Sequence, residues 1–78
     1  MNEIKLPLEI LKNNINKEIR LIMRKDKVFS GVLRTFDEHV NIFMENVYEI
    51  LDDGSRMHIG STIINGGNVA MIDLDITS

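Results

Sequence analysis

The 78-residue sequence has no cysteine, no tryptophan and a single proline, and its only aromatic side chains are three phenylalanines and one tyrosine. The absence of cysteine excludes disulfides and thiolate metal sites as sources of stability. No apolar run approaches the roughly 18 residues of a membrane span, and the first ten residues lack the basic and then apolar pattern of a signal peptide. We therefore expect a soluble, intracellular protein that does not associate with membranes.

The chain is short enough that we expect a single domain, residues 1–78. A domain of this size buries only about 60 % of the surface that its unfolded chain exposes, so its own core provides little stability. Because covalent cross-links are absent, oligomerisation is the ordinary remaining means of stabilisation. We expect the isolated chain either to assemble or to aggregate.

The charges are unevenly distributed along the chain, whose formal net charge is -3. Residues 1–35 contain eight of the nine basic residues and four acidic ones, whereas residues 36–78 contain eight acidic residues and only Arg56. Proteins usually bind nucleic acid by neutralising its phosphates, so in this chain we expect contacts to bases to matter more. The uneven charge also fits self-association, unlike neighbours or an ordinary solvated surface.

The N-terminal segment 6–15 predicts a short helix. Pro7 suits a first helical position, and hydrophobic residues recur at helical spacing at Leu8, Leu11 and Ile15. After residue 17 the pattern changes to the alternation of half-buried strands, predicted at 18–24, 28–36, 40–50, 57–64 and 69–76. The Asp-Gly pair at 53–54 indicates a hairpin turn.

One short helix followed by five antiparallel strands predicts a mainly β fold, in which a strongly bent five-stranded sheet forms a small open barrel. Glycines inside two predicted strands, Gly31 and Gly60, indicate a bulge, a bend or a close backbone approach. The fourth and fifth strands are the expected edges of the sheet. Because these edges are rich in isoleucine and methionine, they favour pairing with another chain.

Conventional catalysis finds little support in the sequence, which has no G-x-S-x-G, no H-E-x-x-H and no P-loop. His39 and His58 lie in separate predicted elements, and their spacing does not indicate a metal site. An acid-base pair such as Asp37 with His39 stays open, but nothing in the sequence singles it out. We expect a protein that is not an enzyme and that holds neither a metal nor a cofactor.

Two polar turns are more informative, DEHVN at residues 37–41 and NGGN at residues 65–68. The plainest interpretation is structural: the side chains of aspartate and asparagine in these turns bond to nearby backbone. On that interpretation, Gly66 and Gly67 are needed only for positive φ angles.

Residues 18–49 resemble the first signature of the Sm and Sm-like protein family. That signature has a strand, a turn, a strand with a central glycine (Gly31), and then an Asp-x-x-apolar-Asn motif, here Asp37, Val40 and Asn41, before an apolar strand. Residues 57–74, which include IINGGNVAMI, resemble the second signature, commonly an apolar pair followed by Arg-Gly-Asp/Asn-x-Val. The two signatures and the helix cover almost the whole chain.

Departures from the two signatures indicate which members of the family the chain resembles most. Asn65 stands where the family usually has arginine, and Gly67 stands where aspartate or asparagine often follows the glycine. The Asn-Gly start of that turn, with LPLE opening the helix, resembles the fifth subunit of the eukaryotic Sm-like heteroheptamer. His39, by contrast, resembles archaeal Sm-like proteins, which form homo-heptamers.

The resemblance implies the Sm fold, an SH3-like barrel in which strand four of one subunit pairs with strand five of the next until seven subunits close a ring. The two polar turns then line the pore. For the eukaryotic subunit, it implies binding of the uridine-rich 3′ end of U6 small nuclear RNA in pre-mRNA splicing, in the nucleus. The same subunit would also serve a cytoplasmic ring in mRNA decapping and decay.

Carried over residue by residue, the resemblance implies that His39 stacks on a base, Asn41 bonds to its Watson-Crick edge and Asp37 holds the Asn41 amide. Asn65 would lie on the other side of the base, and Gly66 would permit close backbone approach. These roles are chemically sensible, because single-stranded RNA is read by stacking its bases and by hydrogen bonds to their edges.

Other interpretations stay open. Replacing arginine by Asn65 removes a guanidinium platform, so the chain could be a structural ring subunit whose own pocket contacts no base. His39 leaves open an archaeal-type homo-heptamer that binds RNA. Three basic residues of the first hairpin either touch phosphate near the ring face or form a solvated turn: Arg24, Lys25 and Lys27.

Overall fold

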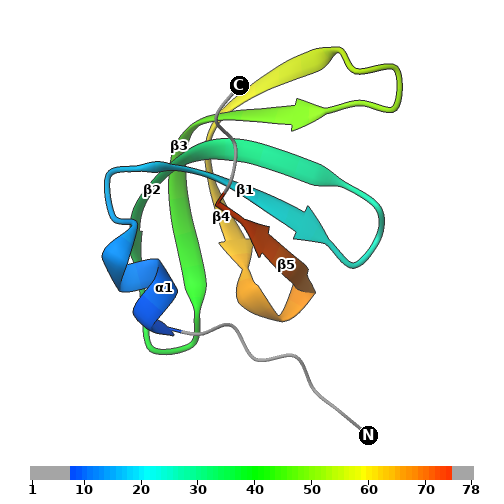
Figure 1. Ribbon diagram of the computed structural model, residues 1–78. Helices are drawn as coiled ribbons and strands as arrows, with labels where there is room; N and C mark the ends of the chain where they lie inside the picture. The colour runs from blue at the N-terminus through cyan, green and yellow to red at the C-terminus, as the bar shows by residue number, and fades with distance from the viewer. Residues whose placement is uncertain (1–7, 75–78) are drawn as a thin grey trace, which may run out of the picture.

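The computed structural model describes residues 8–74, which form one short helix and five strands (Figure 1). The helix is α1 (Leu8–Asn13), and the strands are β1 (Glu18–Met23), β2 (Val28–Phe36), β3 (Asn41–Ile50), β4 (Arg56–Asn65) and β5 (Val69–Asp73), with the 3-10 turn η1 (Gly66–Asn68) between the last two. The sheet order is β4-β3-β2-β1-β5, and every pair is antiparallel. The predicted fold class is confirmed.

The pairing of β2 with β3 is irregular at the glycine inside β2. The register shifts between Ser30 and Val32, and a Cβ on Gly31 would lie only 2.9 Å from Val47 Cγ2 and 3.1 Å from the Glu45 carbonyl oxygen. A larger residue would push the two strands apart. The predicted bulge and close approach at this glycine are therefore both present.

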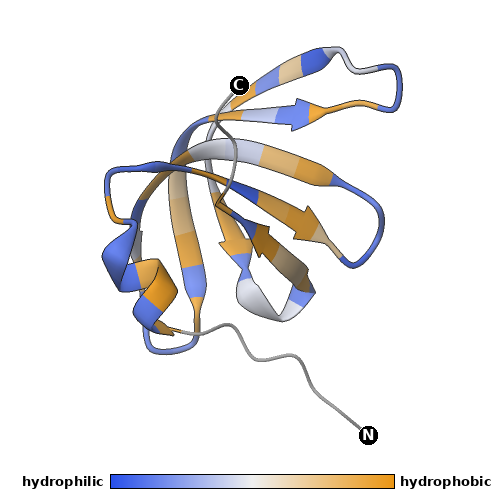
Figure 2. Ribbon diagram, viewed as in Figure 1, coloured by the Kyte–Doolittle hydropathy of each residue, from blue (hydrophilic) through white to orange (hydrophobic). Residues whose placement is uncertain are grey.

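The core lies inside the curved sheet and is wholly aliphatic apart from one thioether. Its buried side chains come from the helix and from every strand: Leu11, Ile19, Leu21, Leu33, Ile42, Met44, Val47, Ile64 and Val69. The hydrophilic residues gather in the turns between the strands (Figure 2). The alternation that predicted half-buried strands is thus explained by one buried face and one solvated face.

The helix ends at Asn13, two residues before the end of the predicted segment. The amide of Asn14 donates from Nδ2 to the Ile10 carbonyl oxygen at 2.7 Å, and Asn16 then turns the chain with a positive φ of 68°. A helix cannot continue through a left-handed residue. Pro7, the predicted first helical residue, lies outside the described residues.

The turn η1 joins the two ends of the bent sheet. On one side Gly66 N donates to the Val40 carbonyl oxygen at 2.8 Å, and on the other Arg24 N donates to the Asn68 carbonyl oxygen at 2.9 Å. Strand β5 then pairs with β1 as far as Asp73, which lies opposite Arg20. The strand is shorter than predicted, since Leu74 lies beyond the last paired residue and residues 75–76 lie outside the described residues.

The two edge strands are β4 and β5, as predicted. Both leave hydrophobic side chains in solvent: Met57, Ile59 and Ile63 on β4 and Met71 on β5, of which Ile63 is 68% exposed. Unpaired edges with such side chains favour association. Within residues 8–74, no helix has the length and apolar character to cross a membrane.

Candidate nucleic-acid interface

The β2–β3 turn is organised by one carboxylate. Asp37 Oδ1 accepts hydrogen bonds from the backbone N–H groups of His39 and Asn41, both at 2.9 Å, and Oδ2 accepts one from Asn41 Nδ2 at 2.9 Å. The first two bonds are the local backbone bonds expected of a turn aspartate. The third fixes the orientation of the Asn41 amide, so a structural role and a positioning role coexist in one side chain.

These bonds also set the ionisation of the carboxyl group. The hydrogen bond from the Asn41 side chain, reinforced by those from the backbone of Asn41 and His39, lowers the pKa of Asp37 from its usual 3.8. Hydrogen bonds to a carboxylate favour its charged form. Asp37 is therefore ionised, and able to hold Asn41, throughout the neutral range.

His39 projects into solvent from the same turn. Its side chain is 77% exposed, and Nε2 lies 3.7 Å from Glu38 Oε2. Within residues 8–74, its imidazole contacts no other ring, since the ring pair found there is Tyr48 with His58. One flat face of His39 is thus free for stacking.

Val40 closes the turn in a strained conformation. Its φ is 60°, in the left-handed region that a β-branched residue rarely adopts. Its N–H donates to the Asp37 carbonyl oxygen at 3.0 Å, and its own carbonyl accepts from Gly66. This strained residue separates His39 from Asn41, and its own side chain packs against the core.

The second turn meets the first through glycine. A Cβ on Gly66 would lie 2.6 Å from Val40 Cγ1 and 2.8 Å from the Val40 carbonyl oxygen. The expectation that Gly66 and Gly67 serve positive φ angles is wrong, since the positive-φ glycines within residues 8–74 are Gly54 and Gly60. Gly66 is required instead for its small size, and both glycines adopt the right-handed 3-10 conformation of η1.

Asn65 caps η1 and faces the first turn. Its Oδ1 accepts from Gly67 N at 2.7 Å, as expected of a turn asparagine, and its Cα lies opposite that of Asn41 in the β3–β4 ladder. Asn68 was expected to bond to backbone through its side chain. It contributes its carbonyl oxygen instead, to Arg24 N.

The two asparagines present opposite hydrogen-bonding groups. Because Asn41 Nδ2 donates to Asp37, its Oδ1 is left as an acceptor; because Asn65 Oδ1 accepts from Gly67, its Nδ2 is left as a donor. Directly opposite residues of an antiparallel pair have Cβ atoms about 4.5–5.5 Å apart. A planar ring carrying both an N–H and a carbonyl oxygen on one edge matches this pair.

The structure brings together all five residues that the sequence singled out: Asp37, His39, Asn41, Asn65 and Gly66. Residues 35–55, which include the β2–β3 turn and β3, contain no lysine or arginine, so this segment brings no such cation to the site. Within residues 8–74, no group of three or more potential ligands could hold a metal ion. Sequence reasoning missed Val40 as a positioning residue, because nothing local to it signals a positive φ.

Comparison with known proteins shows which family the chain belongs to. A family model described as the LSM domain matches residues 9–74. The chain is 37% identical over 70 residues to the Sm-like protein LSM5 of Arabidopsis thaliana, covering 86% of this chain and 80% of that protein. It is 36% identical over 70 residues to the probable U6 snRNA-associated Sm-like protein LSm5 of Dictyostelium discoideum, covering 86% of this chain and 72% of that protein.

Solved structures show the same fold. The P. aerophilum SmAP1 heptamer has a subunit that superposes with a TM-score of 0.78 at 31% identity, covering 90% of this chain and 93% of that chain. The Pyrococcus abyssii Sm protein, solved in complex with a uridine heptamer, gives a TM-score of 0.78 at 28% identity, covering 88% of this chain and 97% of that one. The predicted resemblance, including that to the fifth Sm-like subunit, is confirmed, and the chain belongs to the LSM-domain family.

Proposed function

We propose that this chain is a non-enzymatic ring subunit that holds one base of a uridine-rich single-stranded RNA between its two polar turns. The observation that carries the proposal is the fixed pair of amides: Asp37 orients Asn41 as an acceptor, and η1 orients Asn65 as a donor. Uracil presents an N3–H donor between two carbonyl acceptors, so its edge matches both groups. His39, exposed beside them, would stack on the ring, a contact worth roughly 1–3 kcal/mol per base.

Two proteins that this chain resembles are named or solved together with RNA, and they support a more specific role. A relative from Dictyostelium discoideum is named as U6 snRNA-associated, and a structural relative binds a uridine heptamer. For this chain we infer the uridine-rich 3′ end of U6 small nuclear RNA in pre-mRNA splicing, in the nucleus, with a further role in cytoplasmic mRNA decapping and decay. The ring would be a heteroheptamer joined through the β4 and β5 edges.

Native mass spectrometry of the purified chain, alone and with a short oligouridine, tests the assembly. A monomer or small oligomer that ignores RNA would mean that unlike Sm-like subunits are required. A homo-heptamer carrying RNA would favour the archaeal-type alternative, to which the heptameric SmAP1 relative lends support.

Variants of the assembled ring test the pocket. We expect Asn41→Ala and His39→Ala each to weaken oligouridine binding about tenfold, which corresponds to roughly 1.4 kcal/mol. Asn13→Ala, at the exposed end of α1, is the matched control and should leave binding unchanged. Unchanged affinity in Asn41→Ala would contradict the proposal and would indicate a structural subunit whose pocket contacts no base.

A further inference from the structure

The two edges of the sheet differ in which side chains accompany the backbone groups that face outward along the edge. In an antiparallel pair, the N–H and C=O groups of one residue point toward the same neighbouring strand, and those of the next residue point the other way. Each edge strand therefore has one set of residues that faces its paired strand and one set that faces the open edge. The side chains of the second set decide how another chain can join that edge.

On β4 the set that faces the open edge points its side chains away from the core. Gly66 N donates to the Val40 carbonyl oxygen at the end of the β3–β4 ladder. Counting back two residues, Ile64 also faces β3, so the backbone groups of Ile63 point to the open edge. The side chain of Ile64 is buried in the core, whereas that of Ile63 is 68% exposed.

On β5 the arrangement is the reverse. Met23 N donates to the Lys27 carbonyl oxygen in β2, so the backbone groups of the preceding residue, Ile22, face β5. Met71 lies opposite Ile22 and faces it, which leaves the backbone groups of Ile72 pointing to the open edge. The side chain of Ile72 packs against the core, whereas that of Met71 is 58% exposed.

Joining β4 of one copy to β5 of another therefore exchanges the faces of the sheet. Directly opposite residues of an antiparallel pair have backbone groups that both face the partner or both face away, and their side chains lie on one side of the sheet. Ile63 can thus lie opposite Ile72 but not opposite Met71. In that position the outward side chain of Ile63 lies over the inner face of the second copy, and Met71 of the second copy lies over the inner face of the first.

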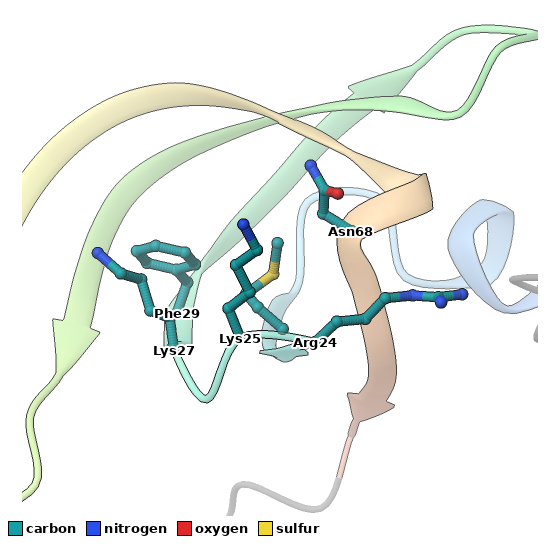
Figure 3. Close-up of a pocket in the computed structure, with 6 residues that line it drawn as sticks. Arg24, Lys25, Lys27, Phe29 and Asn68 are labelled. Carbon is teal, nitrogen blue, oxygen red and sulfur yellow. The ribbon is translucent and has the colours of Figure 1, made fainter.

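The inner face has room beside this edge. A hollow of about 280 Å³ lies at the end of the β1–β2 hairpin, and its lining includes Met23, Phe29 and Asn68. Met23 and Phe29 pack against the core, and Met23 lies opposite Val69 at the start of β5. Figure 3 shows the residues that line the hollow, with the Arg24 guanidinium directed away from it. The core is thus incompletely covered next to the open edge, where burial of an aliphatic side chain is favourable.

We propose that β4 of one copy of this chain joins β5 of a second copy with the faces exchanged, so that each copy covers the core of the other. Ile63 of the first copy packs beside Ile72 of the second, and Met71 of the second packs over the core of the first. These are the two most exposed large hydrophobic side chains of residues 8–74, and the exchange removes both from water.

The partner that fits is an edge strand with an aliphatic residue at the position of Ile63, because a charged residue there would be buried against the core of its neighbour. The inference rests on the proposed function, since it takes the β4 and β5 edges as the junctions of the ring. It adds the face on which the contact is made and the side chains that make it.

Cysteine cross-linking tests the exchange of faces, since the chain has no cysteine of its own. One copy carries Ile63→Cys, and the other carries either Ile72→Cys or Met71→Cys. Because each copy has a single cysteine, every covalent dimer joins two chains. With a short thiol-specific cross-linker, we expect the Ile72→Cys mixture to give several times more covalent dimer than the Met71→Cys mixture.

The outcomes separate this inference from the proposed function. More covalent dimer with Met71→Cys than with Ile72→Cys would show that the faces are kept, and would overturn the inference without touching the RNA site. A chain that stays monomeric would overturn it too, because a second copy would not occupy the edge, while a ring with unlike subunits could still bind RNA. Cross-linking as expected without oligouridine binding would contradict the proposed function alone.

Polar substitution at the edges gives an independent test. We expect Ile63→Ser and Met71→Ser each to weaken self-association about tenfold in sedimentation velocity, because each leaves a neighbouring core partly uncovered. Both side chains are exposed in the single chain, so circular dichroism should show an unchanged fold.

Leu51→Ser is the matched control. Leu51 is 36% exposed in the β3–β4 turn, outside both edge strands, and its replacement should leave self-association unchanged. If all three variants lost the same affinity, association would follow total exposed hydrophobic surface, and the proposed contact would be refuted.

Discussion

The two turns of the candidate site hold polar side chains next to each other, yet they are built in different ways. The β2–β3 turn depends on one carboxylate that accepts three hydrogen bonds, and on a valine with a φ of 60°. The turn after β4 depends on a neutral amide that accepts one bond, and on a glycine that fits against that valine. The first turn can therefore be disrupted by acid or by removing charge, whereas the second holds no charge in these contacts and is sensitive to added volume.

The largest effect is expected from adding volume. In Gly66→Ala the new Cβ would lie 2.6 Å from Val40 Cγ1 and 2.8 Å from the Val40 carbonyl oxygen, and moving the β2–β3 turn and η1 apart would break the hydrogen bond from Gly66 N to Val40 O. Overpacking of this kind costs about 1–3 kcal/mol. We expect chemical denaturation to show a loss in that range, together with a loss of oligouridine binding.

Gly67→Ala is the matched control for this change. A Cβ at that position would approach only the Asn65 Oδ1 atom, at 3.0 Å, and a side chain can yield where backbone cannot. We expect a loss of no more than about 1 kcal/mol, comparable to one hydrogen bond. Equal losses of stability in the two variants would show that the small size of Gly66 is not what allows the two turns to pack together.

Removing charge should act on the first turn alone. In Asp37→Asn, the single side-chain oxygen can still accept the two backbone hydrogen bonds, but the new NH2 group cannot accept from Asn41 Nδ2. The Asn41 amide therefore loses its fixed orientation. We expect oligouridine affinity in the assembled ring to fall by about tenfold, close to the effect of Asn41→Ala. Full affinity in Asp37→Asn would contradict the positioning role of this carboxylate.

The same carboxyl group makes the first turn sensitive to acid. Since the pKa of Asp37 is lowered in the folded state, its stabilising contribution is present above the usual pKa of 3.8 and is lost as the pH falls through the lower folded value. We expect Asp37→Asn to flatten the acid end of the stability profile measured by thermal denaturation.

Asp53 offers the matched control for acid sensitivity. The side-chain and backbone hydrogen bonds from Ser55 lower the pKa of Asp53 in the β3–β4 hairpin, far along the chain from the polar turns. We expect Asp53→Asn also to flatten the acid end of the profile while leaving oligouridine affinity unchanged. If Asp53→Asn also lowered oligouridine affinity, a loss of acid-sensitive stability alone could weaken RNA binding, and the affinity loss in Asp37→Asn would not show that Asp37 positions Asn41.

The smallest change in stability is expected from relieving strain at Val40. Val40→Gly keeps the left-handed conformation but removes its cost of about 1–2 kcal/mol for a residue with a Cβ. It also loses a partly buried side chain and adds backbone flexibility worth about 0.5–1 kcal/mol. We expect stability within about 1 kcal/mol of the parent and a weaker affinity for oligouridine. Asn46→Gly relieves a similar φ of 55° in β3 and should leave RNA binding unchanged.

Local pattern was enough to predict the elements and the chemistry of the turns. Alternation located every strand, and the glycine inside β2 predicted a bulge that is present at Gly31. Asp37 and Asn65 were expected to bond to nearby backbone, and both do. These features depend on residues a few positions apart, which is the range over which sequence pattern carries information.

What the sequence did not predict depends on contacts between distant segments. Gly66 and Val40 meet only because β3 and β4 pair in one register, with Asn41 opposite Asn65. The turn alone suggested a positive φ for Gly66, which is a local property and is wrong, whereas the close backbone approach that the Sm-like resemblance implied for Gly66 depends on this register. The sequence also gave no sign of the hollow at the end of the β1–β2 hairpin that Met23, Phe29 and Asn68 line together, since Asn68 reaches the other two only when η1 closes the sheet.

The pairing of β1 with β5 also determines how the chain must fold. Arg20 and Asp73 are partners in the sheet, although strands β2, β3 and β4 all lie between them in the sequence. Closing so large a loop is entropically costly, so we expect the three hairpins among β1 to β4 to form first and closure to come late. Until β5 pairs with β1, β1 is a third unpaired edge beside an open apolar core. At the subunit concentrations that drive assembly, pairing of this edge with another chain will therefore compete with closure.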